Sequence, residues 1–577
     1  MPVAHTSTIE AQLVSGTWAD LSADVLGRVA CRYGVMGNGP RDGVASGGEM
    51  TFDLNNSAQN SGATLGWYSP VHSGKRTGWT YGIPARWVIT YQSAASVSSI
   101  TRVLQVATVT TGAAHGLTTG EWVTLSGAAQ TEYNGTFQVT VTGASTFTVT
   151  VTGTPATPAT GTLLWVQAYV RFRGKVGDIR PDPGRYRERR VRVVCYDPMR
   201  DLMDADVREV STLVDQTEDT LISAVLSALP ATAQPPDTDL DAGLDQYPYA
   251  FDNVGAGVKA GSLLNSIVLS GLGALFTKGD GTLVYRTRHA RALATTQGTF
   301  TDATILDLEA PSSIANAFNH IRTTIHPKTI DAAATTVLWE QTGMPPAVKP
   351  GATMTTWATY RSPTNDLQLI GGLSQVTPLV ASQDYAANDA DDGTGLDRTS
   401  DLSVTATPFA TTVKFELTNN GTSELFVTLL QLRGKAIYDI GARTFESYVA
   451  EDYGDRPITI DLPYQDDPEI GQSAADYLRQ QYHDLTTQVS GVRFVATGSA
   501  ALMAQAMERE PMDCVTLSET VTGLSSVDVI VQSVELTRES SRQLTCRFLL
   551  APASPFDAWM LGTAGRGELG STTLLGF

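Results

Sequence analysis

The chain has 577 residues, too many for one hydrophobic core, so about three to five domains are expected. Its hydrophobic fraction of 42% argues against wholesale disorder. With 40 basic and 59 acidic residues the net charge is −19, which disfavours a protein that grips nucleic acid by its phosphates.

The N-terminal segment MPVAHTSTIE lacks a basic stretch followed by an apolar core, so no secretory signal is expected. No run of about 18 apolar residues occurs, which predicts no membrane span. We therefore expect a soluble chain made in a cytoplasm. The cysteines are far apart in apolar, strand-like segments, which predicts buried free thiols rather than a zinc site or disulfides: Cys31, Cys195, Cys514 and Cys546.

The first 92 residues alternate apolar and polar side chains in short runs separated by turn-forming residues, a pattern typical of strands. RWVITYQ, residues 86–92, and WVQAYVRFRG, residues 165–174, resemble the two arms of one hairpin. Residues 93–162 between them are rich in Thr and Val, poor in charge, and contain an Asn-Gly turn. They predict a small all-β module inserted in the hairpin loop.

An arginine cluster follows this region, and it alternates with apolar residues. The alternation indicates a solvated or interfacial strand face, or its turn, rather than a nucleic-acid site. The cluster comprises Arg185, Arg187, Arg189, Arg190 and Arg192.

Residues 211–300 predict an α/β domain. Thr217 followed by two acidic residues indicates a helix start, and Pro230 marks its end. A second helix leads into a β-hairpin whose turn is Lys278–Gly281. Residues 301–465 again alternate as strands and predict a second barrel. An amphipathic helix beginning near Pro468 and a final β module complete residues 466–554.

No nucleotide-binding, zinc-protease or serine-hydrolase motif occurs, and the seven histidines are scattered. The acidic run at Asp389, Asp391 and Asp392 lacks the bidentate glutamate of a calcium loop, so a solvated loop is expected. We predict no catalytic residue, no metal site and no cofactor.

The last residues, 555–577, combine five glycines with apolar side chains whose exposure to water is unfavourable. Such a segment cannot build its own core, so it either lies on a surface or is a disordered terminus.

Several segments in chain order resemble the minor tail proteins of long-tailed phages, in particular the hub of the baseplate or tail tip. The segments are GTWADLSADV with TFDLNN, YVRFRGKVGDIRPD, VRVVCYDPMRDLMD, SLLNSIVLSGLGALFTKGDGTLVYRTR, FNHI, ELFVTLLQLRGKAIY and AWMLGTAGRGELGSTTLLGF. The inserted HGLTTGEWVTLSG and YNGTFQVT look like the β modules that decorate phage tail proteins.

The resemblance implies a mainly β fold with α/β parts and two barrels like those of tail-tube subunits. Three copies with two barrels each would then continue a six-fold tube. The implied domains are a split first barrel (1–92 and 163–210), an inserted β domain (93–162), an α/β domain (211–300), a second barrel (301–465), a linking helix with a C-terminal β module (466–554) and a docking tail (555–577).

The implied role is a structural protein of the virion tail tip, without enzymatic activity, that takes part in host attachment and lets DNA pass without specific binding. The implied partners are two further copies, the distal tail protein, the tape-measure protein, and tail fibre or receptor-binding proteins. Two alternatives are a distal tail ring protein and a receptor- or carbohydrate-binding tail protein that uses residues 93–162.

In this setting the glycine-rich tail becomes a candidate interaction site. We expect Trp559 to anchor it in its own C-terminal module. The remainder would lie against a neighbouring subunit or partner through Leu569, Leu574, Leu575 and Phe577.

Overall fold

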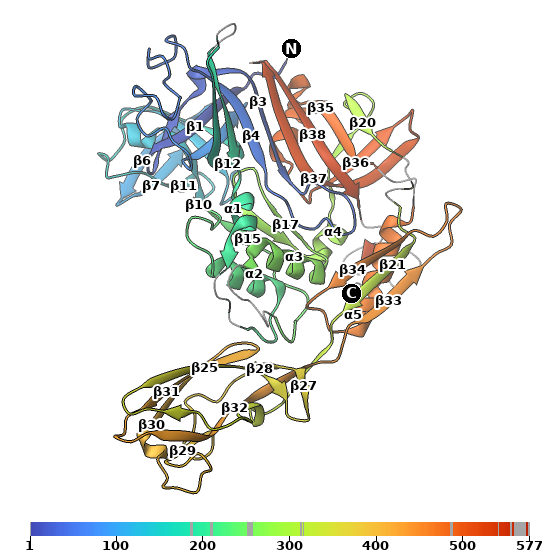
Figure 1. The fold of residues 1–577 in the computed structure, drawn as a ribbon. Coiled ribbons are helices and arrows are strands. Elements are labelled where there is room, and N and C mark those ends of the chain that lie inside the picture. Colours follow the sequence, from blue (N-terminus) through green and yellow to red (C-terminus); the bar gives the residue numbers. More distant parts are fainter. Residues whose placement is uncertain are drawn as a thin grey trace.

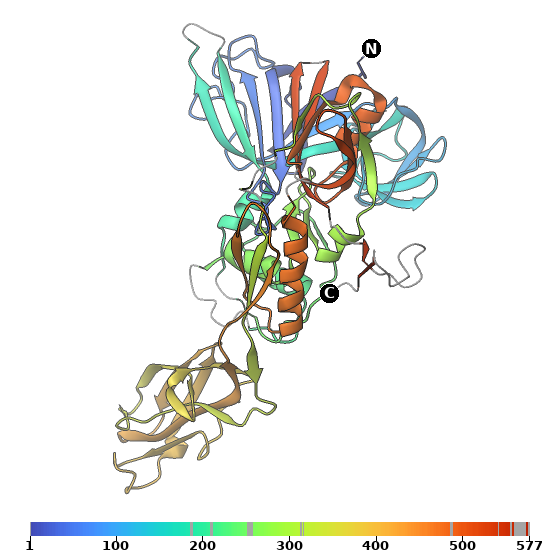
Figure 2. The ribbon, with the colours of Figure 1, turned by 90° about the vertical axis from the view of Figure 1, so that its right-hand side faces the viewer.

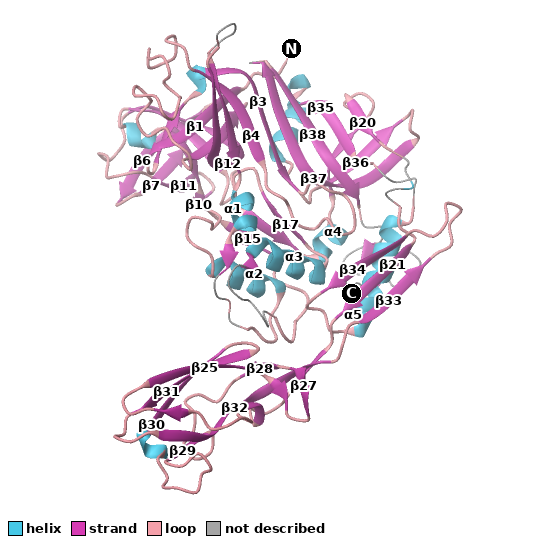
Figure 3. Ribbon diagram, in the orientation of Figure 1, coloured by secondary structure: helices cyan, strands magenta, loops and turns pink. Residues whose placement is uncertain are grey.

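A computed structural model describes residues 2–184, 189–207, 210, 212–250, 258–311, 314, 317–484, 489–540, 542–553, 557–558 and 573–574. The fold is mainly β with α/β parts, as the sequence predicts (Figure 3). Two β units lie side by side above a layer of helices, and a separate arm projects below (Figure 1). None of the described helices is both long and apolar enough to cross a membrane.

The N-terminal β unit is a sheet in the order β2-β1-β5-β12-β13-β4-β3. Its inward side chains, such as Phe52 and Trp87, are fully or nearly fully buried. From the arginine cluster, Arg190 and Arg192 both contact Asp53, at 3.0 and 3.2 Å. The strands are β1 (Thr6–Val14), β2 (Thr17–Asp20), β3 (Val25–Gly34), β4 (Glu49–Asn55), β5 (Pro84–Thr90), β12 (Gly161–Asp182) and β13 (Arg190–Tyr196), with a 3-10 turn at Ser22–Asp24.

The chain leaves this sheet after β5 and returns to it in β12, which pairs antiparallel with β5. The first half of β12 instead pairs with β6 and β8 of the intervening residues, whose core contains Tyr133 and Phe147. The long strand β12 thus ties the two sheets together. The intervening strands are β6 (Ala95–Val103), β7 (Val106–Thr111), β8 (Trp122–Ala128), β9 (Gly135–Gln138), β10 (Thr140–Gly143) and β11 (Thr146–Thr150), with a 3-10 turn at Thr131–Tyr133.

The C-terminal β unit joins the N-terminal one edge to edge. β37 pairs antiparallel with β3, from Val29↔Arg538 to Gly34↔Ser533, and the two units share one hydrophobic core. All four cysteines are buried and free, which confirms the prediction for them. The unit comprises β19 (Thr296–Phe300), β20 (Asp307–Glu309), β35 (Gly491–Val495), a 3-10 turn (Ala496–Gly498), α6 (Ala500–Glu508), β36 (Cys514–Glu519), β37 (Leu524–Ser540) and β38 (Gln543–Pro552).

The α/β layer lies beneath the two units. Its sheet has the order β15-β18-β17, and α2 begins after Thr217 with two acidic residues in its first turn, as predicted. The elements are α1 (Pro198–Asp204), β14 (Asp206–Val207), α2 (Glu218–Ser227), β15 (Thr238–Leu240), β16 (Val258–Lys259), α3 (Ala260–Gly271), β17 (Ala274–Thr277), β18 (Leu283–Arg286) and α4 (Arg288–Leu293).

The described strands of residues 301–465 divide among separate sheets, which differs from the single barrel expected there. β20 joins the C-terminal unit, and β21 (His320–Ile325), β33 (Arg443–Tyr448) and β34 (Pro457–Leu462) form a small sheet. Helix α5 (Pro468–Tyr482) packs on that sheet after the N-cap Asp467. Alternation of period two identifies a strand and its buried face, but it does not specify the partner strand.

The remaining strands form the arm, which projects below the body in two views (Figures 1 and 2). Lys328 of the arm lies over the ring of Tyr249 in the body, 4.8 Å from its centroid. The arm has its own core, built around Phe415 and Leu432. Its strands are β22 (Lys328–Ile330), β23 (Thr336–Glu340), β24 (Ala347–Val348), β25 (Thr353–Thr359), β26 (Arg361–Ser362), β27 (Asn365–Leu369), β28 (Gly371–Leu373), β29 (Tyr385–Asn388), β30 (Leu402–Pro408), β31 (Thr412–Asn419) and β32 (Leu425–Asp439), with a 3-10 turn at Thr399–Asp401.

Candidate functional site: a charged junction of four parts

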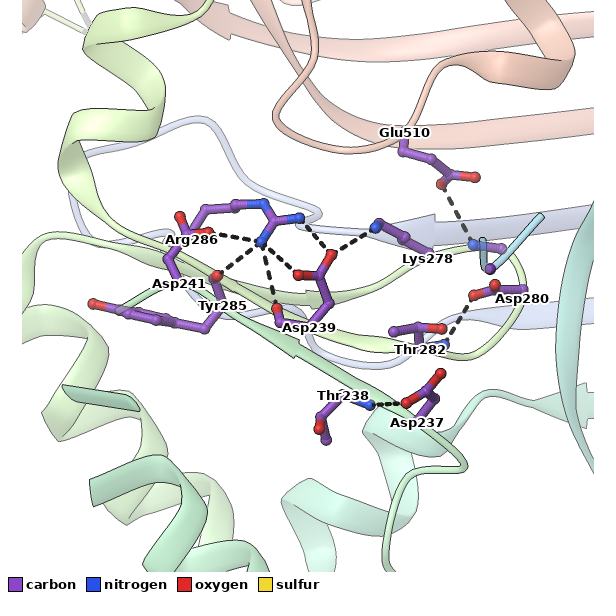
Figure 4. Close-up of polar contacts among 12 residues, drawn as sticks. Asp237, Thr238, Asp239, Asp241, Lys278, Asp280, Thr282, Tyr285, Arg286 and Glu510 are labelled. Carbon is purple, nitrogen blue, oxygen red and sulfur yellow. Dashed lines mark hydrogen bonds and ion pairs between the residues drawn. The ribbon is translucent and has the colours of Figure 1, made fainter. Parts of the chain in front are cut away.

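The turn between β17 and β18 lies where four parts of the chain meet. The backbone N–H of Lys278 donates to the carbonyl of Thr282 at 3.0 Å, and Gly281 donates back to Lys278 at 3.0 Å. Gly281 has a φ of +87°, which glycine adopts without steric penalty. Asp280 accepts from the N–H of Thr282 at 3.0 Å (Figure 4). The turn predicted from Lys278–Gly281 is therefore present.

Three other parts of the chain contact this turn. The indole N–H of Trp122, from β8, donates to Asp280 at 3.2 Å. The N–H of Gly279 donates to Glu510, from the C-terminal unit, at 3.4 Å (Figure 4). A Cβ on Gly279 would lie 2.9 Å from the carbonyl oxygen of Val170 in β12, so the turn also approaches the N-terminal unit closely.

A network of ion pairs extends from the turn across the surface of the sheet β15-β18-β17 (Figure 4). Asp239 contacts Lys278 at 2.9 Å and Arg286 at 2.6 Å, and Arg286 also contacts Asp241 at 2.9 Å. The hydrogen bond from Arg286 holds the pKa of Asp239 well below its usual range. Because these side chains are 22–43% exposed, the network orders the surface more than it stabilises the fold.

Arg171 of β12 forms the buried side of the junction, with a side chain that is only 2% exposed. Its guanidinium donates to the carbonyls of Met507 and Arg509 at 2.8 and 3.0 Å, and to Glu510 at 2.7 Å. Met507 lies in the last turn of α6 and Arg509 directly follows it, so Arg171 satisfies carbonyls at the C-terminal end of that helix. One arginine thus links the two β units.

A cavity of about 380 Å³ lies among these elements. Trp122 and Tyr169 contribute aromatic surface, and Glu121, Asp239 and Glu510 contribute carboxylates. The described lining contains no histidine, cysteine or serine, and it includes Glu510, whose pKa burial raises above its usual range. Across the described part of the chain, no group of three His, Cys, Asp or Glu could hold a metal ion. The geometry suits a mechanical junction.

A second polar cluster lies inside the α/β layer. Glu218 is fully buried and accepts a hydrogen bond from the hydroxyl of Tyr247 at 3.1 Å. Nearby, Arg288 and Asp245 form a bidentate pair at 2.8 and 3.0 Å, with both side chains 6% exposed. Burial raises the pKa of Glu218 above its usual range, and the neighbouring Asp245 adds to the shift.

This shift predicts how stability depends on pH. A carboxyl whose pKa is raised on folding binds its proton more tightly in the folded state, so acidification towards its unfolded-state pKa stabilises the fold. The stability of the wild type relative to Glu218→Gln should therefore increase as the pH falls from above the raised pKa to about 4.5. Urea unfolding of both proteins across this range measures the difference. A constant difference would contradict a buried, titrating Glu218.

The interaction residues expected in the tail lie largely outside the described residues. These are Trp559, Leu569, Leu575 and Phe577. Leu574 belongs to β40 (Thr573–Leu574), which pairs in parallel with β39 (Asp557–Ala558), and β39 lies against α4. The backbone at Leu574 is thus paired with another segment of the tail, beside Ala558.

Sequence reasoning missed the junction residues. Arg171 lies in a strand that is buried on both faces, between Val170 and Phe172, and its partners are mostly backbone carbonyls. Every residue has a backbone carbonyl, so the sequence does not indicate which carbonyls a side chain will contact. The one available signal was the turn at Lys278–Gly281, whose role in joining the parts was not apparent.

No protein-family model matches the chain, and no curated protein matches it in sequence. In structure it is similar to a 43 kDa tail protein of prophage MuSo2 from Shewanella oneidensis, at 10% identity and a TM-score of 0.45, over 96% of this chain and 99% of that one. It is also similar to a tail protein from Neisseria meningitidis (8%, TM-score 0.42, 95% and 96%) and a prophage tail protein from Listeria monocytogenes (7%, TM-score 0.36, 94% and 94%). Two of these structural neighbours are prophage tail proteins, and the third is described as a tail protein.

Proposed function

We propose that this chain is a structural hub protein of a phage tail tip. The observation that carries the proposal is the edge-to-edge union of two β units in one chain through β3 and β37. Three copies of such a chain present six β units around one axis, as a six-fold tube requires of the ring that meets it. The ordered sequence segments support the same role.

In this role the hub is a homotrimer that joins the tail tube and the distal tail ring to the proteins of the tip. Its partners are the distal tail protein, the tape-measure protein, and tail fibre or receptor-binding proteins. Because the net charge is −19, DNA would pass through the ring without being held by it. The hub would also take part in attachment to the host.

Copy number tests this assignment. We expect three copies of the chain at the tail tip of an intact particle, measured by electron cryomicroscopy with symmetry determined rather than imposed. Six copies would instead identify a distal tail ring protein.

Deletion of residues 93–162 tests the alternative, in which that module binds the receptor. If the chain is a hub and the module is decoration, particles that lack the module should still assemble and adsorb to the host.

The proposed role is structural rather than catalytic, since the described lining of the junction cavity contains no histidine, cysteine or serine. Zymography on bacterial cell walls should therefore show no clearing by the purified chain. Clearing that survives further purification would contradict a purely structural role.

The tail, residues 555–577, is proposed to dock on a neighbouring subunit or partner. Its deletion should leave the thermal unfolding of the isolated chain nearly unchanged, because glycine-rich termini add little to a folded core. The trimer, or its complex with the distal tail protein, should be lost, as measured by native mass spectrometry. A trimer and complex that survive the deletion would contradict docking by the tail.

A further inference from the structure

The arm has an exposed sheet face of unusual composition. In the sheet β25-β31-β30, the inward side chains, such as Ala358 and Phe415, lie in the arm's core. The outward side chains alternate with them and are exposed or half-buried. We call this surface, with the adjoining Phe409, the threonine face: Thr353, Thr355, Trp357, Thr359, Ser403, Thr405, Thr407, Phe409, Thr412, Lys414, Glu416 and Thr418.

Trp357 is the one large aromatic side chain on β25, and it is 61% exposed. Its ring stacks on that of Phe409, with centroids 5.6 Å apart and planes at 23°. Phe409 is itself 38% exposed. The pair forms exposed aromatic surface on an otherwise polar face, and exposed aromatic side chains are typical of binding surfaces.

Hydroxyl groups surround this plate. Thr355 and Thr359 flank Trp357 on the same face of β25, spaced by two residues or about 6.8 Å. Thr412 lies opposite Thr359, and Thr407 pairs with Lys414 beside Trp357. Threonine is stiff at χ1, so its hydroxyl is held in place with little entropy left to lose on binding.

The charge of the face indicates what kind of ligand it fits. Its charged residues are Lys414 and Glu416, which pair with each other at 2.8 Å. The face is therefore neutral, although the chain carries a net charge of −19. A neutral face lacks the cationic groups that bind nucleic acids and other polyanions. Threonine and serine are also poor anchors in protein–protein interfaces, whose cores are apolar.

We propose that the threonine face binds a neutral glycan chain. One sugar ring would place its apolar C–H face on Trp357, and its hydroxyl rim would exchange hydrogen bonds with the threonines and the Lys414–Glu416 pair. This arrangement matches the two kinds of surface that a sugar ring presents. The proposal does not rest on the tail-tip assignment, because the binding requires only one folded chain.

The test measures binding of the purified full chain to an array of defined oligosaccharides. The array holds neutral oligosaccharides of hexoses and N-acetylhexosamines, together with their uronic-acid and sulfated counterparts. We expect at least one neutral oligosaccharide to bind, and its acidic counterpart to bind no better. In calorimetry with that oligosaccharide, Trp357→Ala should weaken binding by at least about tenfold. Thr359→Val, which keeps the side-chain shape, should weaken it several-fold. Tyr448→Ala, at an aromatic on β33 that is 56% exposed, is the matched control and should bind normally.

Three outcomes would overturn the proposal. The first is a wild-type chain that binds no neutral oligosaccharide at millimolar concentration. The second is equal binding by the wild type and the Trp357→Ala and Thr359→Val variants. The third is concentration-dependent self-association that Trp357→Ala abolishes in the absence of glycan binding, which would make the face a contact between copies. If Trp357→Ala does not fold, Thr359→Val decides.

Discussion

Replacing Arg171 with methionine is expected to lower the free energy of unfolding by about 3–5 kcal/mol. The substitution leaves the carbonyls of Met507 and Arg509 without their donor and Glu510 without its cation. A buried acceptor that is left without a hydrogen bond destabilises the fold by its full desolvation penalty. The cation–π contact with Tyr33, at 5.5 Å, is also lost. Urea unfolding measures the total effect, and hydrogen exchange of α6 locates it.

Two comparisons separate this explanation from a general effect of losing an arginine. Arg180→Ala removes a surface pair with Asp178 and should cost less than about 1 kcal/mol, because the Arg180 side chain is 68% exposed. Arg171→Met combined with Glu510→Gln should recover part of the loss, since burial already raises the pKa of Glu510 and the double variant buries no charge there. A single variant as stable as the wild type would show that the junction does not join the two units.

Local features of this fold were predictable because their causes are local. Helix α2 begins with two acidic residues in its first turn, and α5 begins where Asp467 accepts from the N–H of Glu469. The buried side chains of α5 include Ala474, Leu478 and Tyr482, which recur every four residues, as expected of an amphipathic helix. The turn at Lys278–Gly281 follows from glycine's access to positive φ.

The pairing of distant strands was not predictable in the same way. The two β units meet through contacts such as that between Arg28 and Thr537, which are 509 positions apart in the chain. Residues 301–465 alternate as strands throughout, yet β20 joins the C-terminal unit while β25 belongs to the arm. An alternating strand specifies which side chains are buried, and the edge it joins depends on shape and burial far away in sequence.

The candidate site was less predictable than the fold because its strongest contacts involve backbone groups. Arg171 and the N–H of Gly279 meet carbonyls or a carboxylate of the C-terminal unit, and the sequence around them does not indicate these distant partners. The threonine face could not be predicted from the sequence either. Trp357 alternates with inward residues like any core aromatic, and only the three-dimensional fold shows that it points outward.

Gly34→Ala is expected to destabilise the protein by about 2–5 kcal/mol by disturbing the join between the two β units. Gly34 ends β3 opposite Ser533 and has a φ of +103°, where alanine is strained. A Cβ there would lie 2.5 Å from the carbonyl oxygen of Gln532 and 2.9 Å from the Cα of Ser533, both in the backbone of β37. That backbone can move away only by opening the β3–β37 ladder.

Gly16→Ala supplies the matched control for this prediction. Gly16 also has a positive φ, of +76°, but an added Cβ there meets nothing within 4 Å, so only the backbone strain of about 1–2 kcal/mol remains. Urea unfolding should rank Gly34→Ala well below Gly16→Ala in stability, and hydrogen exchange should increase in β37 for Gly34→Ala alone. Equal losses in the two variants would mean that the close approach of β3 to β37 contributes nothing. A join that opens in this way could not hold two units at the fixed spacing that the proposed ring of six would require.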